Sequence, residues 1–190
     1  MDKEQIKSCC SGQLSDNGNT AQSSCCCAGK SAVETQKILI ELMYVDLTTC
    51  DRCMGTDTSL DEAVAEVSNL LKSTGREIEV RKILVETEQQ AGELGFVSSP
   101  TIRINGQDIQ LDFKESLCGC CGEIVGEDID CRVWIWQGQE YTTPPKAMLL
   151  DAILRYVYAP KQEETKKMKQ AVPDNLKRFF AAKNSKNKRD

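Results

Sequence analysis

The residues of this sequence best suited to chemistry are its cysteines. The 190-residue chain contains eleven cysteines and no histidine. The lack of histidine excludes zinc sites with imidazole ligands, nucleophiles activated by imidazole, and an imidazole base that titrates near neutral pH. Any reactive or metal-binding site is therefore expected to use sulfur.

Cys50 and Cys53 are three positions apart in the segment TTCDRC, where an apolar run gives way to a helical pattern. Such a pair is a dithiol that cycles to a disulfide, half of a metal site, or two inert buried thiols. In the first turn of a helix the Cα atoms of residues i and i+3 lie about 5 to 6 Å apart, within the range of a disulfide. The helix N-terminus would also lower the pKa of the Cys50 thiol. Asp51 would oppose this effect and Arg52 would assist it, so the sign of their sum stays open.

Seven cysteines are directly adjacent to another cysteine. They are Cys9 and Cys10, Cys25, Cys26 and Cys27, and Cys120 and Cys121. Neighbouring Cα atoms lie about 3.8 Å apart, below the usual disulfide range, so these groups are poor internal disulfides. They present several soft thiolates to one ion, which favours zinc, copper(I), arsenic(III) or mercury(II). For the N-terminal groups the alternative is a disordered tail whose cysteines have no function.

The third group of cysteines comprises Cys118, Cys120, Cys121 and Cys131 in the glycine-rich segment 112–131. A flexible loop with four sulfurs can close a four-thiolate zinc or iron–sulfur site, although C-x-C-C is not a zinc-ribbon spacing. Alternatively, the segment folds over the edge of the Cys50/Cys53 pair and supplies a third thiolate for a trigonal ion, or a relay dithiol. A structural metal site that only orders the segment is a further alternative.

The chain shows no signal for secretion or membrane insertion. Its first twenty residues contain no apolar core of a signal peptide, and no run of eighteen apolar residues occurs. We therefore predict a cytoplasmic protein with no membrane span, in which the cysteines are mostly reduced and do not form a structural disulfide framework.

Charge is distributed unevenly along the sequence. Residues 1–159 carry a net charge of −11 and residues 160–190 a net charge of +6. Nucleic acid is not a favoured ligand for so acidic a body.

Four acidic residues near the cysteine-rich segment are interpreted as solvated charges, namely Asp108, Asp112, Glu115 and Glu123. Trp134 and Trp136 share one face of an expected strand and are interpreted as core.

Hydrophobic patterning divides the chain into three parts. Residues 1–35 are interpreted as a flexible cysteine-containing arm, residues 36–159 as one domain, and residues 160–190 as a Lys-rich tail with one short amphipathic helix through Leu176, Phe179 and Phe180 that docks on the domain. Strands are expected at 37–47, 77–86, 100–111 as a hairpin around an Asn-Gly turn, and 131–141 with a turn at Gly138. Helices are expected from a capping box at 59–62 to a stop at Gly75, at 87–95, and at 142–159 with proline in the first turn. This order predicts an α/β domain with a mixed sheet flanked by helices, interrupted by a non-periodic insertion at 112–131.

A strand that runs into C-x-x-C at a helix start, followed later by Ser99-Pro100-Thr101, resembles the thioredoxin fold over residues 37–158. The segments TTCDRC, SSPTIRING, LCGCCGE and DCRVWIW, with two prolines before the last helix, are similar to a small prokaryotic family of cysteine-rich thioredoxin-like proteins of unknown function. The resemblance implies that Cys50 is the exposed nucleophilic thiol, that Cys53 resolves the mixed disulfide, and that Pro100 follows a cis peptide bond and packs beside the pair. The dipeptide between the cysteines is Asp-Arg here, whereas Gly-Pro is typical of reducing thioredoxins.

Three functions follow as hypotheses. In the first, the dithiol and the cysteine clusters bind, reduce or transfer a thiophilic metal or metalloid ion, with a protein partner for the ion or for electrons. In the second, the protein is a thiol–disulfide oxidoreductase in which Cys50 attacks a substrate disulfide and Cys53 resolves the product. In the third, it is a non-catalytic protein with a structural zinc or iron–sulfur site in the insertion.

Overall fold

The computed structural model describes residues 35–159 and 171–186, so the predictions for the N-terminal arm, including Cys9, Cys10, Cys25, Cys26 and Cys27, lie outside the described residues. The elements are β1 (Gln36–Tyr44), α1 (Asp51–Ser73), β2 (Arg76–Leu84), α2 (Glu88–Leu94), β3 (Thr101–Ile104), β4 (Gln107–Asp108), β5 (Lys114–Leu117), α3 (Gly119–Val125), β6 (Asp130–Trp136), β7 (Gln139–Tyr141), α4 (Lys146–Tyr158) and α5 (Asp174–Lys186).

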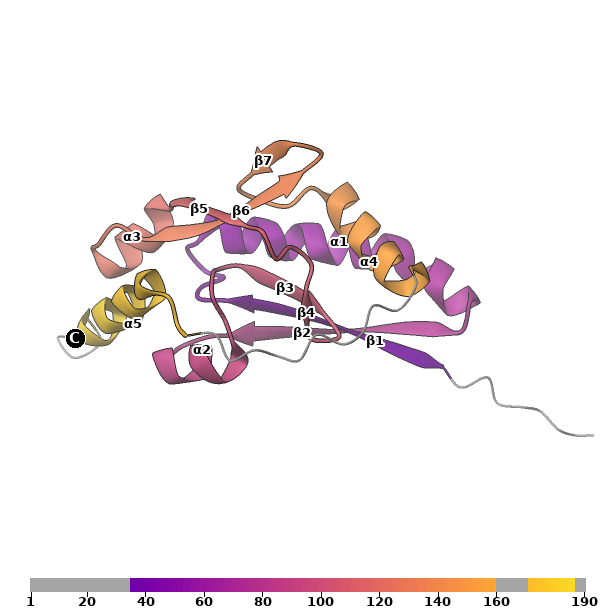
Figure 1. The fold of residues 1–190 in the computed structure, drawn as a ribbon, viewed down its shortest axis with the longest axis horizontal. Helices are drawn as coiled ribbons and strands as arrows, with labels where there is room; N and C mark the ends of the chain where they lie inside the picture. Colours follow the sequence, from indigo (N-terminus) through magenta and orange to yellow (C-terminus); the bar gives the residue numbers. More distant parts are fainter. Residues whose placement is uncertain (1–34, 160–170, 187–190) are drawn as a thin grey trace, which may run out of the picture. The chain divides into compact units, whose positions relative to one another are not determined.

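A mixed four-stranded sheet organises the domain, as predicted (Figure 1). Its strand order is β2-β1-β3-β4, with β1 parallel to β2 and antiparallel to β3. The parallel pair is joined through α1, which is the crossover that such a pair requires. Asn105 and Gly106 both have positive φ in the β3–β4 turn, which is the conformation that favours Asn-Gly in a two-residue hairpin.

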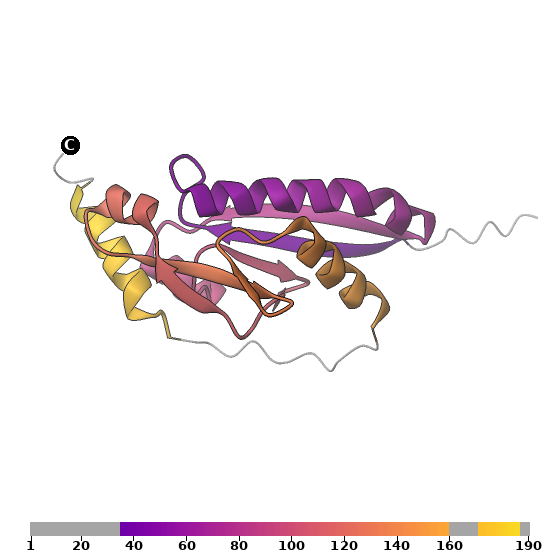
Figure 2. The ribbon, with the colours of Figure 1, turned by 90° about the horizontal axis from the view of Figure 1, so that it is seen from above.

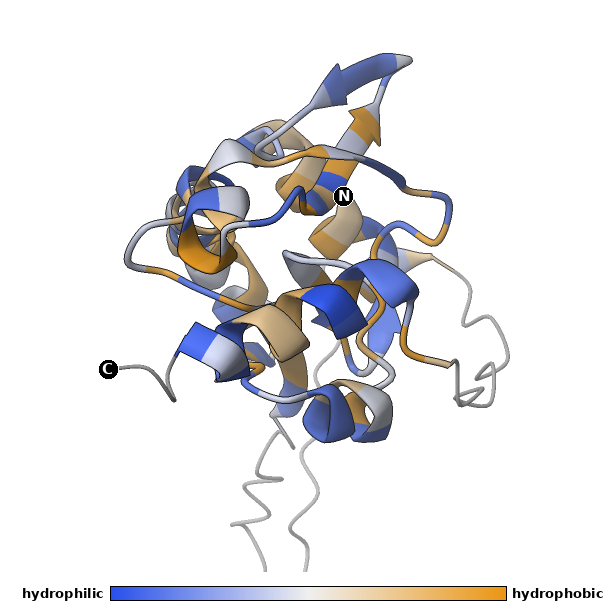
Figure 3. Ribbon diagram, turned by 90° about the vertical axis from the view of Figure 1, so that its left-hand side faces the viewer, coloured by the Kyte–Doolittle hydropathy of each residue, from blue (hydrophilic) through white to orange (hydrophobic). Residues whose placement is uncertain are grey.

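One face of the sheet is covered by α1 and α4, which pack side by side (Figure 1, Figure 2). Alternate residues of β1 point to this face and are at most 2% exposed, because side chains in a strand alternate between faces. The buried stripe of α1 meets them at helical spacing through Leu60, Ala63, Val67 and Leu71. Helix ribbons in Figure 3 accordingly alternate hydrophobic and hydrophilic colours.

The other face of the sheet carries α2, and α5 packs against α2 and α3. Helix α2 begins and ends as predicted, since the Thr87 hydroxyl accepts a hydrogen bond from the Gln90 amide and Gly95 adopts the left-handed conformation. Helix α5 buries Leu176, Phe179 and Phe180 completely or nearly so. The expected amphipathic helix therefore contributes to the same core cluster as the cysteines.

Helix α1 begins nine residues earlier than the capping box at Ser59 predicts. Cys50 is its N-cap, in an extended conformation, and Asp51 is its first residue. Gly55 allows this early start, because a Cβ there would lie 2.7 Å from the Thr143 hydroxyl oxygen in the segment before α4. Since the chain is already helical at Ser59, the polar residues there lie within the helix.

Two prolines precede α4. Pro145 is the N-cap of this helix and does not lie within its first turn, where a proline was predicted.

The cysteine-rich segment 112–131, predicted to be non-periodic and flexible, contains regular structure. It forms β5, α3 and the start of β6, and β5, β6 and β7 form a separate three-stranded antiparallel sheet. The seven-residue α3 is too short for its period to be recognised in sequence. Five residues of this segment contribute to the buried core, namely Cys118, Cys121, Val125, Ile129 and Cys131.

A buried ion pair links the two sheets. Arg132 of β6 is fully buried, and its guanidinium donates hydrogen bonds of 2.9 and 2.8 Å to the two carboxylate oxygens of Asp108. The same guanidinium stacks 4.3 Å from the Phe113 ring centroid. Asp108 is thus not a solvated charge as predicted, and Glu115 is also engaged, since it accepts a 2.7 Å hydrogen bond from the Ser98 hydroxyl.

Candidate functional site

The loop after β1 presents Cys50 at the start of α1. One carboxylate oxygen of Asp46 accepts hydrogen bonds from the backbone amides of Thr48, Thr49 and Cys50, at 2.9, 2.5 and 3.1 Å. Burial raises the pKa of Asp46, but these backbone amides outweigh it and the pKa is lowered overall. Asp46 therefore orients Cys50, a role that sequence reasoning missed although an Asp before Thr-Thr is a familiar signal of such a turn.

Cys53 lies one helical turn further along α1 and is fully buried. Its sulfur is 3.4 Å from the Ser99 hydroxyl, which also accepts a 3.3 Å hydrogen bond from the Val45 amide. The peptide bond between Ser99 and Pro100 is cis, as the resemblance implies. The segment before β3 thus borders the C-x-x-C pair.

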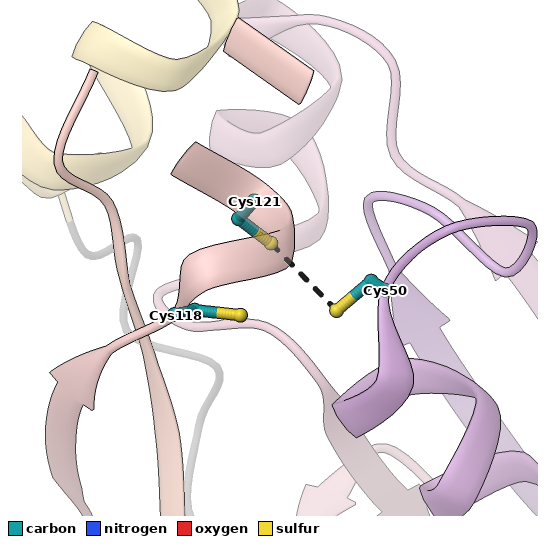
Figure 4. Close-up of side chains that lie close together, drawn as sticks. All are labelled: Cys50, Cys118 and Cys121. Carbon is teal, nitrogen blue, oxygen red and sulfur yellow. Dashed lines mark hydrogen bonds between the residues drawn. The ribbon is translucent and has the colours of Figure 1, made fainter. Parts of the chain in front are cut away.

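Helix α3 brings two further sulfurs to the same place. Cys118 is its N-cap and Cys121 lies in its first turn, so both thiols face the start of α1 (Figure 4). Gly126 ends the helix in the left-handed conformation, and the Lys186 ammonium of α5 donates to the carbonyl oxygens of Glu123 and Ile124 near that end. These contacts hold α3 over Cys50.

The sulfur atoms of Cys50, Cys118 and Cys121, hereafter the sulfur trio, all lie within 4.8 Å of one another. The Cys121 thiol donates to the Cys50 sulfur at 3.7 Å (Figure 4). Metal–sulfur bonds of about 2.3 Å place sulfur ligands about 3.8 Å apart in a tetrahedral site and about 4.0 Å apart in a trigonal one. The trio therefore matches one thiophilic ion with only small side-chain adjustments.

The other two cysteines of the segment occupy different positions. Cys131 is buried, and its thiol donates to the Cys121 sulfur at 3.3 Å. Cys120 points elsewhere and donates to an Asp51 carboxylate oxygen at 3.5 Å. The four cysteines of the insertion therefore do not converge on one point, as one hypothesis requires. Cys120 faces Asp51, and the third sulfur of the trio comes from Cys50 of α1.

Cys50 is not the exposed thiol that the resemblance implies. It is 0% exposed, because α3 covers the edge of the sheet where the sulfur would otherwise meet solvent. Its sulfur is 3.7 Å from that of Cys121 and within 4.8 Å of that of Cys118, so the atom lies among other sulfurs in the core. The arrangement agrees with the alternative in which the insertion folds over the dithiol.

Hydrogen bonds among the thiols separate them into acceptors and donors. The thiol of Cys118, then those of Cys121, Cys131 and Cys53, lower the pKa of Cys50 far below its usual range by donating to its sulfur. Donation from Cys121 and Cys131 lowers the pKa of Cys118 to about 6. The same contacts raise the pKa of Cys53, Cys121 and Cys131, with burial adding to the effect. Cys50 is therefore the main hydrogen-bond acceptor among these sulfurs, and its thiolate is the one that the cluster stabilises most.

Arg52 fastens α1 to the cysteine-rich segment. Its guanidinium donates to the carbonyl oxygens of Ser116, Leu117 and Cys131 at 3.2, 2.7 and 3.1 Å, and to the Ser116 hydroxyl at 3.1 Å. The sequence alone predicts only an electrostatic effect of Arg52 on Cys50. The structure gives it a second task, since it sets the position of β5 and β6 relative to the dithiol.

Replacing Arg52 with lysine should loosen this junction. A lysine ammonium is a single point donor and cannot span four acceptors on two strands, so two or more backbone carbonyls lose a charged partner. We expect the free energy of unfolding to fall by about 2 kcal/mol, measured by urea denaturation of the reduced protein. The exposed change Arg155→Lys on α4 is the matched control, and equal stability of the two variants would contradict the assigned role.

An open depression adjoins the site on the far side of Cys118. It is lined by Leu117, Cys118 and Gly119 and by the acidic residues Glu123, Glu127 and Asp128. Cys118 is 2% exposed and borders both this depression and the sulfur trio.

No described helix is both long and apolar enough to span a bilayer.

Comparison with known families places these features in context. Residues 38–153, more than half of the chain, match the model of a domain of unknown function, DUF2703. The chain therefore belongs to that family. No curated protein and no solved structure matches the chain. The matched segment includes all six described cysteines, so the sulfur trio lies within the family domain.

Proposed function

We propose that this domain binds one thiophilic metal or metalloid ion through Cys50, Cys118 and Cys121. The observation that carries the proposal is the convergence of three buried sulfurs from two chain segments to within 4.8 Å. Soft thiolates favour soft ions, and a site without imidazole or carboxylate ligands disfavours magnesium, calcium and manganese. The ion would be cargo or substrate, and retention of reduced thiols would suit a reducing compartment such as the cytoplasm.

A thioredoxin-like scaffold is part of the proposal. The C-x-x-C pair at the start of α1 and the cis Ser99–Pro100 bond before β3 agree with what the resemblance implies, and both border the mixed sheet β2-β1-β3-β4. Such a scaffold presents its first cysteine at a helix N-terminus, which favours the thiolate form that metal ions require. In this chain the added segment β5 and α3 supplies the remaining two ligands.

The binding experiment uses the full chain, purified and reduced, with arsenic(III) as the probe. We expect one ion per chain by calorimetry and three sulfur neighbours at the arsenic atom by X-ray absorption. Chains with no bound arsenic, or with nitrogen and oxygen neighbours around it, would overturn the proposal.

Cys131 should distinguish trigonal from tetrahedral ions. Its thiol contacts Cys121 at 3.3 Å and also lowers the pKa of Cys50 and Cys118, so it is the available fourth donor. We expect Cys131→Ser to weaken zinc binding by about 100-fold and arsenic(III) binding by less than about threefold, because zinc requires four ligands and arsenic(III) three. Competition titrations with both ions measure these affinities. Equal losses of affinity for zinc and for arsenic(III) would contradict the prediction, because Cys131 would then bind both ions or neither.

A thiol–disulfide oxidoreductase is the second candidate function. The lowered pKa of Cys50 and the position of Cys53 one turn along α1 favour it, whereas the burial of Cys50 opposes it. The variant Cys53→Ser separates the two functions. Under the ion-binding proposal it keeps the arsenic site, whereas under the oxidoreductase alternative it loses insulin reduction, the activity to be assayed.

Transfer of the ion to a partner, and participation of the N-terminal arm, extend the same proposal. The arm contains Cys9, Cys10, Cys25, Cys26 and Cys27, which are soft donors at high local concentration. Deletion of residues 1–35 should slow uptake of arsenic(III) if the arm delivers ions. An unchanged rate and affinity would assign the arm no part in binding.

A further inference from the structure

Two pairs of side chains lie next to each other where α1 and α3 begin. The inner pair is Cys50 and Cys121, with sulfur atoms 3.7 Å apart, and both residues are fully buried. The outer pair is Asp51 and Cys120, in contact at 3.5 Å, and each is the chain neighbour of an inner residue. Asp51 is exposed and Cys120 is partly exposed.

This arrangement leaves the ion site without an accessible ligand of its own. Every sulfur in the trio is at most 2% exposed, and Cys53 and Cys131 are equally buried. Among the six described cysteines, Cys120 alone reaches the surface. Thiophilic ions travel bound to other thiols, so their transfer requires an accessible sulfur that displaces the carrier before the buried ligands engage.

We propose that Cys120, with Asp51 as proton acceptor, is the entry ligand through which a thiol-bound soft ion reaches the sulfur trio. The inference rests on the proposed ion site. The Cys120 sulfur forms a bond to the ion and one carrier thiolate leaves. The proton of Cys120 passes through the Asp51 carboxylate to that thiolate, so the carrier departs as a thiol and no electrons are transferred. The sulfurs of Cys121, Cys50 and Cys118 then form bonds to the ion one after another, as Cys120 and the two remaining carrier thiolates leave. Each departing sulfur takes up the proton of an incoming thiol or a proton from solvent, so Cys120 is restored as a thiol.

An entry ligand changes rates and leaves the equilibrium constant unaltered, because it contacts the ion only in passing. We test this with arsenic(III) presented in excess glutathione, following arsenic–sulfur absorbance by stopped flow. Cys120→Ser should slow both uptake and release by about tenfold, with a dissociation constant within about threefold of that of the unaltered chain. Equal slowing of uptake and of release identifies an entry ligand. Loss of a final ligand or of a structural residue would instead change the dissociation constant.

Asp51→Asn provides a second variant, at an exposed position where the change should leave the domain folded. It should slow uptake by about threefold, because the departing thiolate loses its local proton route. Glu88→Gln, an equal change in charge on exposed α2, is the control and should leave the rate unaltered.

The outcomes separate this inference from the proposed function. If the unaltered chain binds no arsenic(III), the ion site itself is overturned. If it binds and Cys120→Ser transfers the ion at the normal rate, only the entry role is overturned, and the depression beside Cys118 becomes the route. A large loss of affinity in Cys120→Ser would instead make Cys120 a permanent ligand and would also overturn the entry role.

Discussion

Replacing Cys118 with serine is expected to weaken arsenic(III) binding by about 100-fold or more while the domain stays folded. Cys118 supplies one of three sulfurs within 4.8 Å of one another, and donation from Cys121 and Cys131 lowers the pKa of its thiol to about 6. A serine hydroxyl is a hard ligand that stays protonated near neutral pH, so it cannot replace a thiolate toward a soft ion. Calorimetric titration of the reduced variant measures the loss.

Cys118 is a sharper target than Cys50 because it lies outside the Cys50/Cys53 pair. Loss of ion binding in Cys50→Ser would fit both candidate functions, whereas an oxidoreductase that works through Cys50 and Cys53 alone does not require Cys118. Cys53→Ser is the matched control, since Cys53 is an equally buried cysteine of the same core cluster that lies outside the trio. Similar affinities for arsenic(III) in Cys118→Ser and in the unaltered chain would contradict the proposed site.

Replacing Asp108 with alanine is expected to lower the free energy of unfolding by about 3 to 5 kcal/mol. The change leaves the fully buried Arg132 guanidinium without its carboxylate, and its stacking on Phe113 does not neutralise the charge. Urea denaturation followed by tryptophan fluorescence measures the loss, because Trp134 lies in the core next to Arg132.

Two further variants sharpen this test. The double change Asp108→Leu with Arg132→Met removes both charges, and it should recover much of the stability because apolar residues tolerate such burial. Asp112→Ala, at a nearby exposed position, should change stability by no more than about 0.5 kcal/mol. A loss below about 1 kcal/mol in Asp108→Ala would mean that water or another group satisfies Arg132, contrary to the structure.

The features predicted correctly from sequence depend on interactions between near neighbours. Thr87 caps α2 and Gly95 ends it, and Asn105 with Gly106 forms the β3–β4 turn. Each depends on the conformational preference of a residue and on hydrogen bonds a few positions away. The start of α1 was predicted wrongly because Ser59 offers a good local capping signal, whereas the helix starts at Asp51 and its first turns pack closely against Thr143 at Gly55.

By itself the sequence determined that chemistry must use sulfur and that a mixed sheet with flanking helices would form. These conclusions follow from composition and from periodic patterns, which act over a few residues. Only the tertiary structure decided which sulfurs meet. Cys50 and Cys121 are 71 positions apart, and their contact depends on Arg52 and α5 holding the cysteine-rich segment over the dithiol. Burial of Cys50 has the same origin, because exposure is a property of the packed whole and not of any segment.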